Sequence, residues 1–275
     1  MILDGRIAAD SLVLDIKEKV EKYKEFGEKL KLCVIQLVVD DASQSYLKGR
    51  KKVCEKVGVD LDVYDCSNNT QEEVIELVKR LNEDKEVTGI MIDRPFPKHI
   101  DEASVFACLD PKKDVDGCTI QSAGLLFQNK LSLVPSTAKA VIELLNFYNI
   151  PLQGKRVVVV GRSKTVGAPV AQLLINRNAT VTTCHSKTVD LPSVCKTAEI
   201  LVVAIGKKEF ITKEYLNKDT VVVDVGIHYD EEGKMCGDVA RDNYSYLETY
   251  SPVPRGGGPL TNIALMQNLL LAKEM

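Results

Sequence analysis

The stretch that decides the fold is residues 154–169, which read GKRVVVVGRSKTVGAP. The apolar run from Arg156 to Val160 predicts a strand, Gly161 predicts a turn, and a helical pattern begins at about Ala168. A β-branched strand that ends in glycine before a helix is typical of the first strand and turn of a nucleotide-binding βαβ unit. In such a unit glycines let the backbone approach a phosphate, and the helix N-terminus attracts it. The turn reads G-R-S-x-x-V-G-x-P, which is more specific than the common G-x-G-x-x-G.

Apolar strands alternate with helical segments on both sides of that stretch. In the second half of the chain, further strands are expected at 180–184, 200–204 and 221–225, as a doubly wound sheet requires. In the first half, the pattern predicts strands at 32–39, 61–64 and 87–92, with helices at 43–57 and 71–82 between them. Two more helices are expected at 138–148 and 260–273. The fold class is therefore α/β, with two lobes and a cleft between them.

Composition limits the remaining possibilities. With 275 residues, 45% of them hydrophobic, and a net charge of -3, the chain fits one large domain or two smaller ones. The chain contains neither a basic and apolar leader nor about 18 consecutive apolar residues, so we expect a cytoplasmic protein that is neither secreted nor inserted in a membrane. Eight cysteines occur without a C-x-x-C pair, so neither a metal site nor a disulfide framework is expected. Near-neutral charge and the absence of Trp also disfavour a nucleic-acid partner.

Three further motifs accompany the glycine turn. They are Ser43–Gln44–Ser45–Tyr46, PKKDVDG at 111–117 and PVPRGGGPLT at 252–261. In this order, the four motifs resemble the methylenetetrahydrofolate dehydrogenase/cyclohydrolase family and cover nearly the whole chain. The resemblance implies a folate-binding catalytic domain of residues 1–139 plus 259–275, because the C-terminal helix of that family packs back on the first lobe. It implies a Rossmann-type NADP-binding domain of residues 140–258, a folate as the small-molecule substrate, and a homodimer.

The end of the second strand in this half predicts the cofactor. Enzymes that prefer NAD usually place a carboxylate there, where it binds the ribose hydroxyls and repels a 2′-phosphate. Here the strand ends Cys184-His185-Ser186-Lys187, and Arg162 adds a further donor for a phosphate. We therefore expect NADP. The expected cofactor-binding residues are Gly161, Arg162, Ser163, Val166, Gly167, His185, Ser186, Gly206 and Ile227. The resemblance implies that Ile227 contacts the cofactor through its backbone.

Asp224 ends the fourth strand of this half. We interpret it as a brace of the strand end rather than as a cofactor ligand.

The resemblance implies two chemical steps: oxidation of 5,10-methylenetetrahydrofolate to the methenyl form, and hydrolysis to 10-formyltetrahydrofolate. In the family a Tyr-x-x-x-Lys pattern and a glutamine serve the hydrolysis. Here the pattern reads Tyr46 to Arg50, and Asp93 replaces the glutamine. Arginine stays protonated at any working pH and cannot act as a tunable acid or base, which places the cyclohydrolase step in doubt. Arg50 and Asp93 suit a bidentate ion pair, and the alternative is that they are unrelated surface residues.

The catalytic candidates are Tyr46, Arg50, Asp93 and Asp116. By the resemblance, Tyr46 and Asp116 bind substrate, Asp116 through the pterin ring, together with Pro254 and Gly258; Asp116 could alternatively cap a turn. The expected function is NADP-dependent oxidation of 5,10-methylenetetrahydrofolate in one-carbon metabolism.

Two departures from the family pattern, Arg94 and Arg255, leave other functions open. These cations could receive an extra carboxylate or phosphate of a modified substrate. The chain could also be a catalytically weak paralogue that binds cofactor or a partner protein.

Overall fold

The computed structural model describes residues 1–275, apart from the side chain of residue 42. The chain divides into two compact units. Met1–Asp10 and Thr137–Ala264 form what we call the five-stranded unit, and Ser11–Ser136 with Leu265–Met275 form the three-stranded unit. Helices α1 (Gly5–Glu25) and α9 (Gly258–Glu274) each contribute residues to both units.

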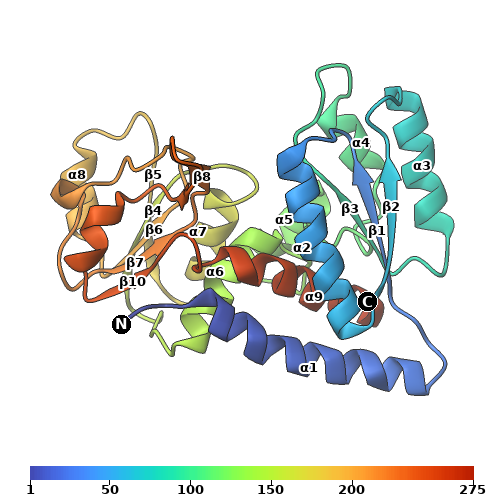
Figure 1. The fold of residues 1–275 in the computed structure, drawn as a ribbon, viewed down its shortest axis with the longest axis horizontal. Helices are drawn as coiled ribbons and strands as arrows, with labels where there is room; N and C mark the ends of the chain where they lie inside the picture. The colour runs from blue at the N-terminus through green and yellow to red at the C-terminus, as the bar shows by residue number, and fades with distance from the viewer. The chain divides into compact units, whose positions relative to one another are not determined.

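The three-stranded unit is built on a parallel sheet in the order β2-β1-β3. Strand β1 is Lys31–Gln36, β2 is Asp60–Asp65 and β3 is Gly89–Ile92 (Figure 1). Its other helices are α2 (Asp41–Val57), α3 (Gln71–Glu83), α4 (Glu102–Cys108) and α5 (Ile120–Phe127). Because the connections from β1 to β2 and from β2 to β3 run in opposite directions, right-handed crossovers place α2 and α3 on opposite faces of the sheet.

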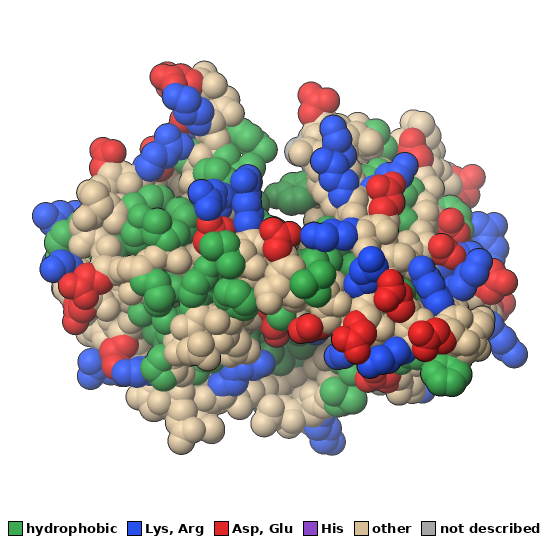
Figure 2. All heavy atoms as spheres, turned by 60° about the horizontal axis from the view of Figure 1, so that its bottom comes forward, with side chains coloured by type: hydrophobic (Ala, Val, Ile, Leu, Met, Phe, Trp, Pro, Cys, Tyr) green, Lys and Arg blue, Asp and Glu red, His purple; other side chains and the backbone are tan. Residues whose placement is uncertain are grey.

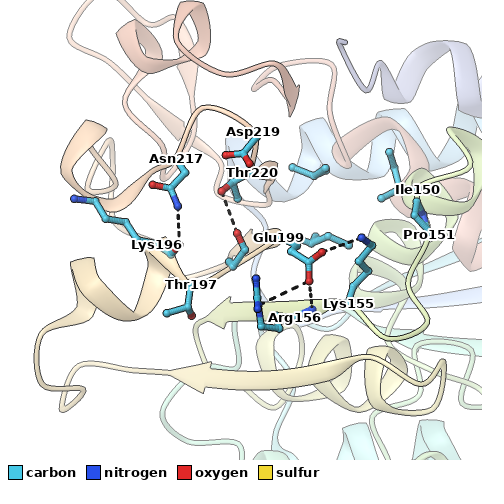
Figure 3. Close-up of a pocket in the computed structure, with 13 residues that line it drawn as sticks. Ile150, Pro151, Lys155, Arg156, Lys196, Thr197, Glu199, Asn217, Asp219 and Thr220 are labelled. Atoms are coloured by element: carbon cyan, nitrogen blue, oxygen red, sulfur yellow. Dashed lines mark hydrogen bonds and ion pairs between the residues drawn. The ribbon is translucent and has the colours of Figure 1, made fainter.

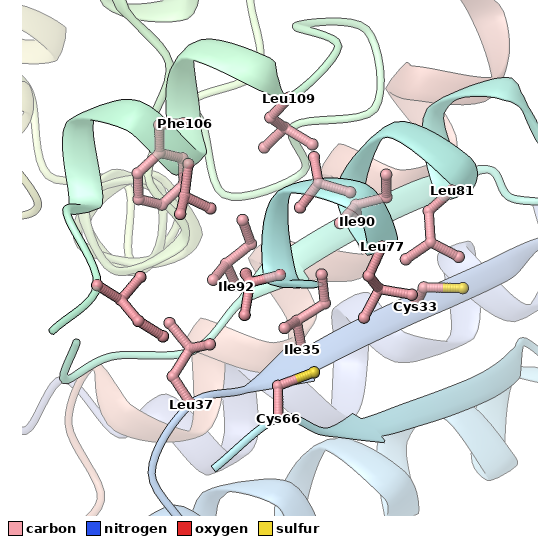
Figure 4. Close-up of a cluster of buried hydrophobic side chains, with 14 of the residues drawn as sticks. Cys33, Ile35, Leu37, Cys66, Leu77, Leu81, Ile90, Ile92, Phe106 and Leu109 are labelled. Carbon is pink, nitrogen blue, oxygen red and sulfur yellow. The ribbon is translucent and has the colours of Figure 1, made fainter. Parts of the chain in front are cut away.

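Hydrophobic side chains fill the space between this sheet and α3 with α4. Ile35, Ile90 and Ile92 from the strands pack with Leu77 of α3 and Phe106 of α4 (Figure 4). The buried residues of α3 recur at helical spacing, which gives the helix one apolar face: Val74, Leu77, Val78 and Leu81. Burying each side chain of this size stabilises the fold by about 1.5–3 kcal/mol.

The five-stranded unit contains a parallel sheet in the order β10-β7-β6-β4-β5. The strands are β4 (Arg156–Val160), β5 (Thr180–Cys184), β6 (Ile200–Val203), β7 (Val221–Asp224) and β10 (Thr249–Ser251). The helices are α6 (Ser136–Phe147), α7 (Gly167–Ile175), α8 (Leu191–Lys196) and the 3-10 turns η1 (Lys213–Tyr215) and η2 (Arg241–Ser245). A two-stranded antiparallel ribbon pairs β8 (His228–Tyr229) with β9 (Met235–Cys236).

The α/β class and the parallel sheets are confirmed, and the predicted bounds of β4 and β5 are those observed. Strand β1 is shorter than predicted and ends at Gln36, because its last partner on β2 is Asp65 and the chain then turns toward α2. The sequence interpretation did not include α1, α4, α5, α8 or β10. The edge strand β10 is short, and Ile2 forms a parallel bridge to its residue Tyr250.

No helix among the described residues is long and apolar enough to span a bilayer. On the face shown in Figure 2, Lys and Arg side chains are interspersed with Asp and Glu side chains. All eight cysteines are free thiols. Burial raises the pKa of the Cys54 thiol to about 11, which makes it a poor nucleophile at neutral pH.

The last turns of α9 are anchored to the three-stranded unit through Asn268. This side chain is fully buried, and its amide nitrogen donates to the carbonyl oxygens of Val115 at 2.8 Å and Val134 at 2.7 Å. One side chain thus holds two separate loop segments against α9.

Replacing Asn268 with Leu should lower the free energy of unfolding by about 2–4 kcal/mol, because two buried carbonyl groups lose a donor. Urea denaturation measures this change. Asn146→Leu, at an exposed position of α6, is the matched control and should change stability by less than about 0.5 kcal/mol. Equal effects of the two substitutions would contradict the anchoring role.

Candidate functional site

The start of α2 sets the position of the first two candidate residues. Asp40 accepts a hydrogen bond from the Ser43 backbone at 2.7 Å, and the Ser43 hydroxyl accepts one from the Asp40 backbone at 2.9 Å. This reciprocal capping box fixes where the helix begins. Tyr46 and Arg50 follow four residues apart, so their side chains lie on one face of the helix.

Arg50 and Asp93 form a bidentate ion pair. The Arg50 Nη1 and Nη2 atoms donate to Asp93 Oδ2 and Oδ1 at 3.0 and 2.9 Å. The side chains are only 5% and 12% exposed, and the Arg50 Nε atom is buried without a partner among the described residues. The predicted pair therefore exists, and the two residues are not independent surface residues. Removing one member of such a pair leaves an uncompensated buried charge, which typically costs about 3–5 kcal/mol.

Asp116 lies in a loop that a neighbouring carboxylate shapes. Buried Asp114 accepts hydrogen bonds from the backbone of Cys118 at 3.0 Å and of Thr119 at 2.7 Å, and from the Ser122 hydroxyl at 3.0 Å. Burial raises the pKa of Asp114. One oxygen of Asp116 accepts the Ser136 backbone N–H at 3.0 Å, and the Cys118 thiol donates to the other oxygen at 3.4 Å. Sequence reasoning missed Asp114, although its place in the Asp-Val-Asp-Gly motif was a usable signal.

The two cations that depart from the family pattern both have carboxylate partners. Arg94 donates through Nη2 and Nε to Glu102 Oε1 at 2.7 and 3.1 Å, and its Nη1 lies 3.9 Å from Asp116 Oδ2. Arg255 pairs with Asp4. Its backbone φ of 87° is in the left-handed region, which favours glycine and in which an arginine is strained. Both cations therefore already have a carboxylate partner, which reduces the attraction they would offer to an extra acidic group of a modified substrate.

The glycine turn after β4 is tightly packed. Gly161 has a φ of 129°, and a Cβ atom there would lie 2.1 Å from the carbonyl oxygen of Ala204. A Cβ on Gly167 would lie 2.3 Å from the carbonyl oxygen of Gly161. The Ser163 hydroxyl accepts the backbone N–H groups of Val166 and Gly167 at 3.2 and 3.3 Å, which caps the start of α7. Both glycines are therefore required by the close approach of the backbone.

A pocket of about 260 Å³ opens where β4, β5 and β6 end. Five of the predicted cofactor residues line it: Gly161, Arg162, Ser163, His185 and Ser186. The His185 Nδ1 atom accepts the Lys187 backbone N–H at 3.1 Å, so the neutral ring carries its proton on Nε2. The described lining of the pocket contains two cations, Arg162 and Lys207, but no carboxylate. These groups and the close-packed glycine turn fit the phosphate-bearing end of NADP.

The remaining predicted residues lie outside that pocket. Val166 and Gly167 begin α7, Gly206 lies between two lining residues, and Ile227 follows β7; none is among the described residues that line it. Pro254 lines a separate groove of about 470 Å³ in the same unit, and Gly258 begins α9. Tyr46, Arg50, Asp93 and Asp116 belong to the other unit.

Asp224 braces the end of β7, as the sequence interpretation preferred. Its carboxylate accepts the backbone N–H groups of Gly226, Asp238 and Val239, and the Tyr244 hydroxyl. Burial raises its pKa to about 6. Asp238 itself, which is fully buried, was missed from the sequence. Its only signal was a charged residue in the small-residue and apolar run Cys236 to Ala240.

A larger cavity of about 680 Å³ lies at the opposite, amino-terminal edge of the five-stranded sheet. There the Glu199 carboxylate lies between Lys155 and Arg156 (Figure 3). The Asn217 amide and the Thr220 hydroxyl donate to backbone carbonyl oxygens. Because these polar groups bind one another, we assign no ligand to this cavity. Among the described residues, no cluster of His, Cys, Asp and Glu side chains is suited to hold a metal ion.

Two family descriptions match almost the entire chain. Residues 3–116 match the catalytic domain of tetrahydrofolate dehydrogenase/cyclohydrolase, and residues 135–275 match its NAD(P)-binding domain. Among curated proteins, the bifunctional protein FolD of Agathobacter rectalis is 45% identical over 275 residues, covering 99% of both chains. FolD of Enterococcus faecalis is 42% identical over 275 residues, covering 99% of this chain and 98% of its own.

Solved structures of enzymes from the same family have a very similar fold. The bifunctional FolD enzyme of Campylobacter jejuni superposes with a TM-score of 0.97 at 35% identity, covering 100% of this chain and 98% of the other. The Trypanosoma brucei methylenetetrahydrofolate dehydrogenase-cyclohydrolase, solved with NADP cofactor and an inhibitor, gives 0.92 at 31% identity, with 100% and 97% covered. The chain belongs to the tetrahydrofolate dehydrogenase/cyclohydrolase family.

Proposed function

We propose that this enzyme oxidises 5,10-methylenetetrahydrofolate to 5,10-methenyltetrahydrofolate with NADP in one-carbon metabolism. The observation that carries the proposal is the cation-bearing pocket at the carboxyl ends of β4, β5 and β6, in a chain that matches both domains of the family. The modified-substrate alternative has no comparable support, since Arg94 and Arg255 are already paired with carboxylates.

Bound NADP supplies the hydride acceptor for the oxidation. The residues of the chain bind and orient the reactants, and the hydride step needs little more than such positioning. Arg162, Ser186 and His185 bind the phosphate-bearing end of the cofactor, while Tyr46 and Asp116 bind the folate. Asp116 is suited to the pterin because the Ser136 N–H fixes one of its oxygens, while the other oxygen has only a weak thiol donor, Cys118 at 3.4 Å, and the more distant Arg94 at 3.9 Å beside it.

The hydrolytic step is slow or absent in this proposal. Water attack on the methenyl cation requires a group that accepts and returns a proton, and general acid-base assistance contributes roughly 10²- to 10⁴-fold. An arginine such as Arg50 does not give up its proton at a working pH. Its two guanidinium Nη atoms donate to the Asp93 carboxylate at 2.9 and 3.0 Å. A separate amidine-hydrolysing enzyme must then consume the methenyl product, or a reductase must return it to the methylene form.

We propose that the domains are residues 1–139 plus 259–275 for folate and residues 140–258 for NADP. The compact units divide the chain after Ser136 and after Ala264, a few residues from these bounds, which supports the proposal, although Met1–Asp10 falls in the five-stranded unit.

Arg162→Ala should weaken NADP binding at least tenfold and NAD binding much less, because one charge-assisted contact to the 2′-phosphate contributes about 1.5–3 kcal/mol. Isothermal titration calorimetry with both nucleotides measures the difference. Asp116→Asn is the control, which should slow folate-dependent turnover and leave the NADP dissociation constant unchanged. Equal loss of NADP and NAD affinity in Arg162→Ala would refute the 2′-phosphate assignment.

The wild-type enzyme should reduce NADP but convert methenyltetrahydrofolate to the formyl product close to the spontaneous rate. The double substitution Arg50→Lys with Asp93→Gln should raise that hydrolysis, because it restores a lysine whose pKa can shift. Arg50→Lys alone should help less, since the lysine stays paired with Asp93. Stopped-flow decay of the methenyl chromophore tests this, and a wild-type rate far above the spontaneous one would show that Arg50 is no obstacle.

We also propose a homodimer, as the family resemblance implies. Exposed hydrophobic residues of the amino-terminal segment, Ile2 at 52% and Ile7 at 58%, support a contact there. Light scattering should give twice the chain mass of 30.4 kDa, and Ile7→Glu should lower it toward that of one chain. A wild-type monomer would rule out the proposal.

A further inference from the structure

The loop that follows β6 is held by one buried carboxylate. Asp238 accepts the backbone N–H groups of Ile205 at 2.7 Å, Gly206 at 3.0 Å and Lys207 at 2.8 Å. A fourth bond, 2.8 Å long, joins Asp238 to the His228 ring. Three consecutive N–H groups that point at one charged acceptor leave the backbone of this loop little freedom.

Asp238 is itself fixed. Its side chain has no exposed surface, and its backbone N–H donates to Asp224 at 3.0 Å. Since Asp224 ends β7, the loop after β6 is tied through two carboxylates to the neighbouring strand. The position of residues 205–207 is thus determined by the sheet.

This arrangement presents the Lys207 side chain to the cofactor pocket. Lys207 lines the same pocket as Arg162, His185 and Ser186. Its Nζ atom lies 5.1 Å from the centre of the Phe210 ring, which also lines the pocket, so the ammonium group has a cation–π partner. The next residue, Lys208, is exposed and is not among the described residues of the lining.

We propose that Lys207 is a further cofactor-binding residue that contacts the 2′-phosphate of NADP, and that Asp238 is its positioning residue. The assignment rests on the proposed use of NADP. Two cationic side chains line the pocket: Arg162 from the loop after β4 and Lys207 from the loop after β6. The described lining contains no carboxylate that would offset their positive charge. A dianionic phosphate is the group of the dinucleotide that this charge pattern recognises best.

The test compares Lys207→Met, which keeps the aliphatic stem, with Lys208→Met as the matched control one residue away. Titration calorimetry with adenosine 2′,5′-bisphosphate and adenosine 5′-monophosphate isolates the 2′-phosphate, and NADP with NAD repeats the comparison on whole cofactors. Lys207→Met should raise the dissociation constants of the two 2′-phosphate ligands roughly tenfold and those of the other two less than about twofold. Lys207→Arg should recover most of the affinity, and Lys208→Met should change none of the four constants by more than about twofold.

Equal weakening of NADP and NAD by Lys207→Met would overturn the 2′-phosphate contact, as would equal effects of the two lysine variants. Failure of the wild type to bind NADP would instead sink the proposed function, so the two failures are distinguishable.

The positioning role of Asp238 is tested in two backgrounds. Asp238→Asn should weaken NADP more than NAD in the wild type and add little in the Lys207→Met variant. A purely structural role would weaken both nucleotides equally in both backgrounds. If Asp238→Asn does not fold, His228→Leu removes one of the four carboxylate partners and should show the same selectivity.

Discussion

Buried aspartates that accept backbone N–H groups hold the loops at the carboxyl ends of both parallel sheets, and the candidate site depends on this interaction. Asp114, Asp224 and Asp238 are all about 1% exposed or less. A buried carboxylate is costly unless it is fully hydrogen-bonded, and each of these accepts at least three hydrogen bonds. The raised pKa of Asp224, about 6, reflects the remaining desolvation. Because the donors are main-chain groups, these carboxylates fix the backbone on which the binding side chains stand.

The Arg50–Asp93 pair is a second buried charge arrangement with a different consequence. Its two members bind each other through two parallel hydrogen bonds in a bidentate geometry. A pair of this kind can still orient a substrate through its charge and its hydrogen bonds. Arg50 and Asp93 are complementary in charge and in geometry. Replacing only one of them would have left a buried charge without its partner.

Charge also distinguishes the two cavities that lie at opposite edges of the five-stranded sheet. At the amino-terminal edge of the sheet, Glu199 pairs with both Lys155 and Arg156 and offsets part of their charge in the larger cavity. At the carboxyl edge, Arg162 and Lys207 line a smaller cavity whose described residues include no carboxylate. The smaller cavity is therefore the better anion site, because unpaired donors and not volume determine phosphate recognition.

The sequence alone determined the fold class, the position of the nucleotide turn and the family, because hydrophobic periodicity and glycine spacing are local properties of the chain. It also suggested the Arg50–Asp93 pair, since both residues fall at matching motif positions with complementary chemistry. It did not reveal Asp238, Asp114 or the place of Lys207. The partners of Asp114 are only four to eight residues away, whereas Asp238 lies more than thirty residues from the loop that it holds. Only the tertiary structure decided the contacts of Asp238 and Lys207, because hydrogen bonds to distant main-chain N–H groups and positions on a pocket wall leave no residue-specific pattern in a single sequence.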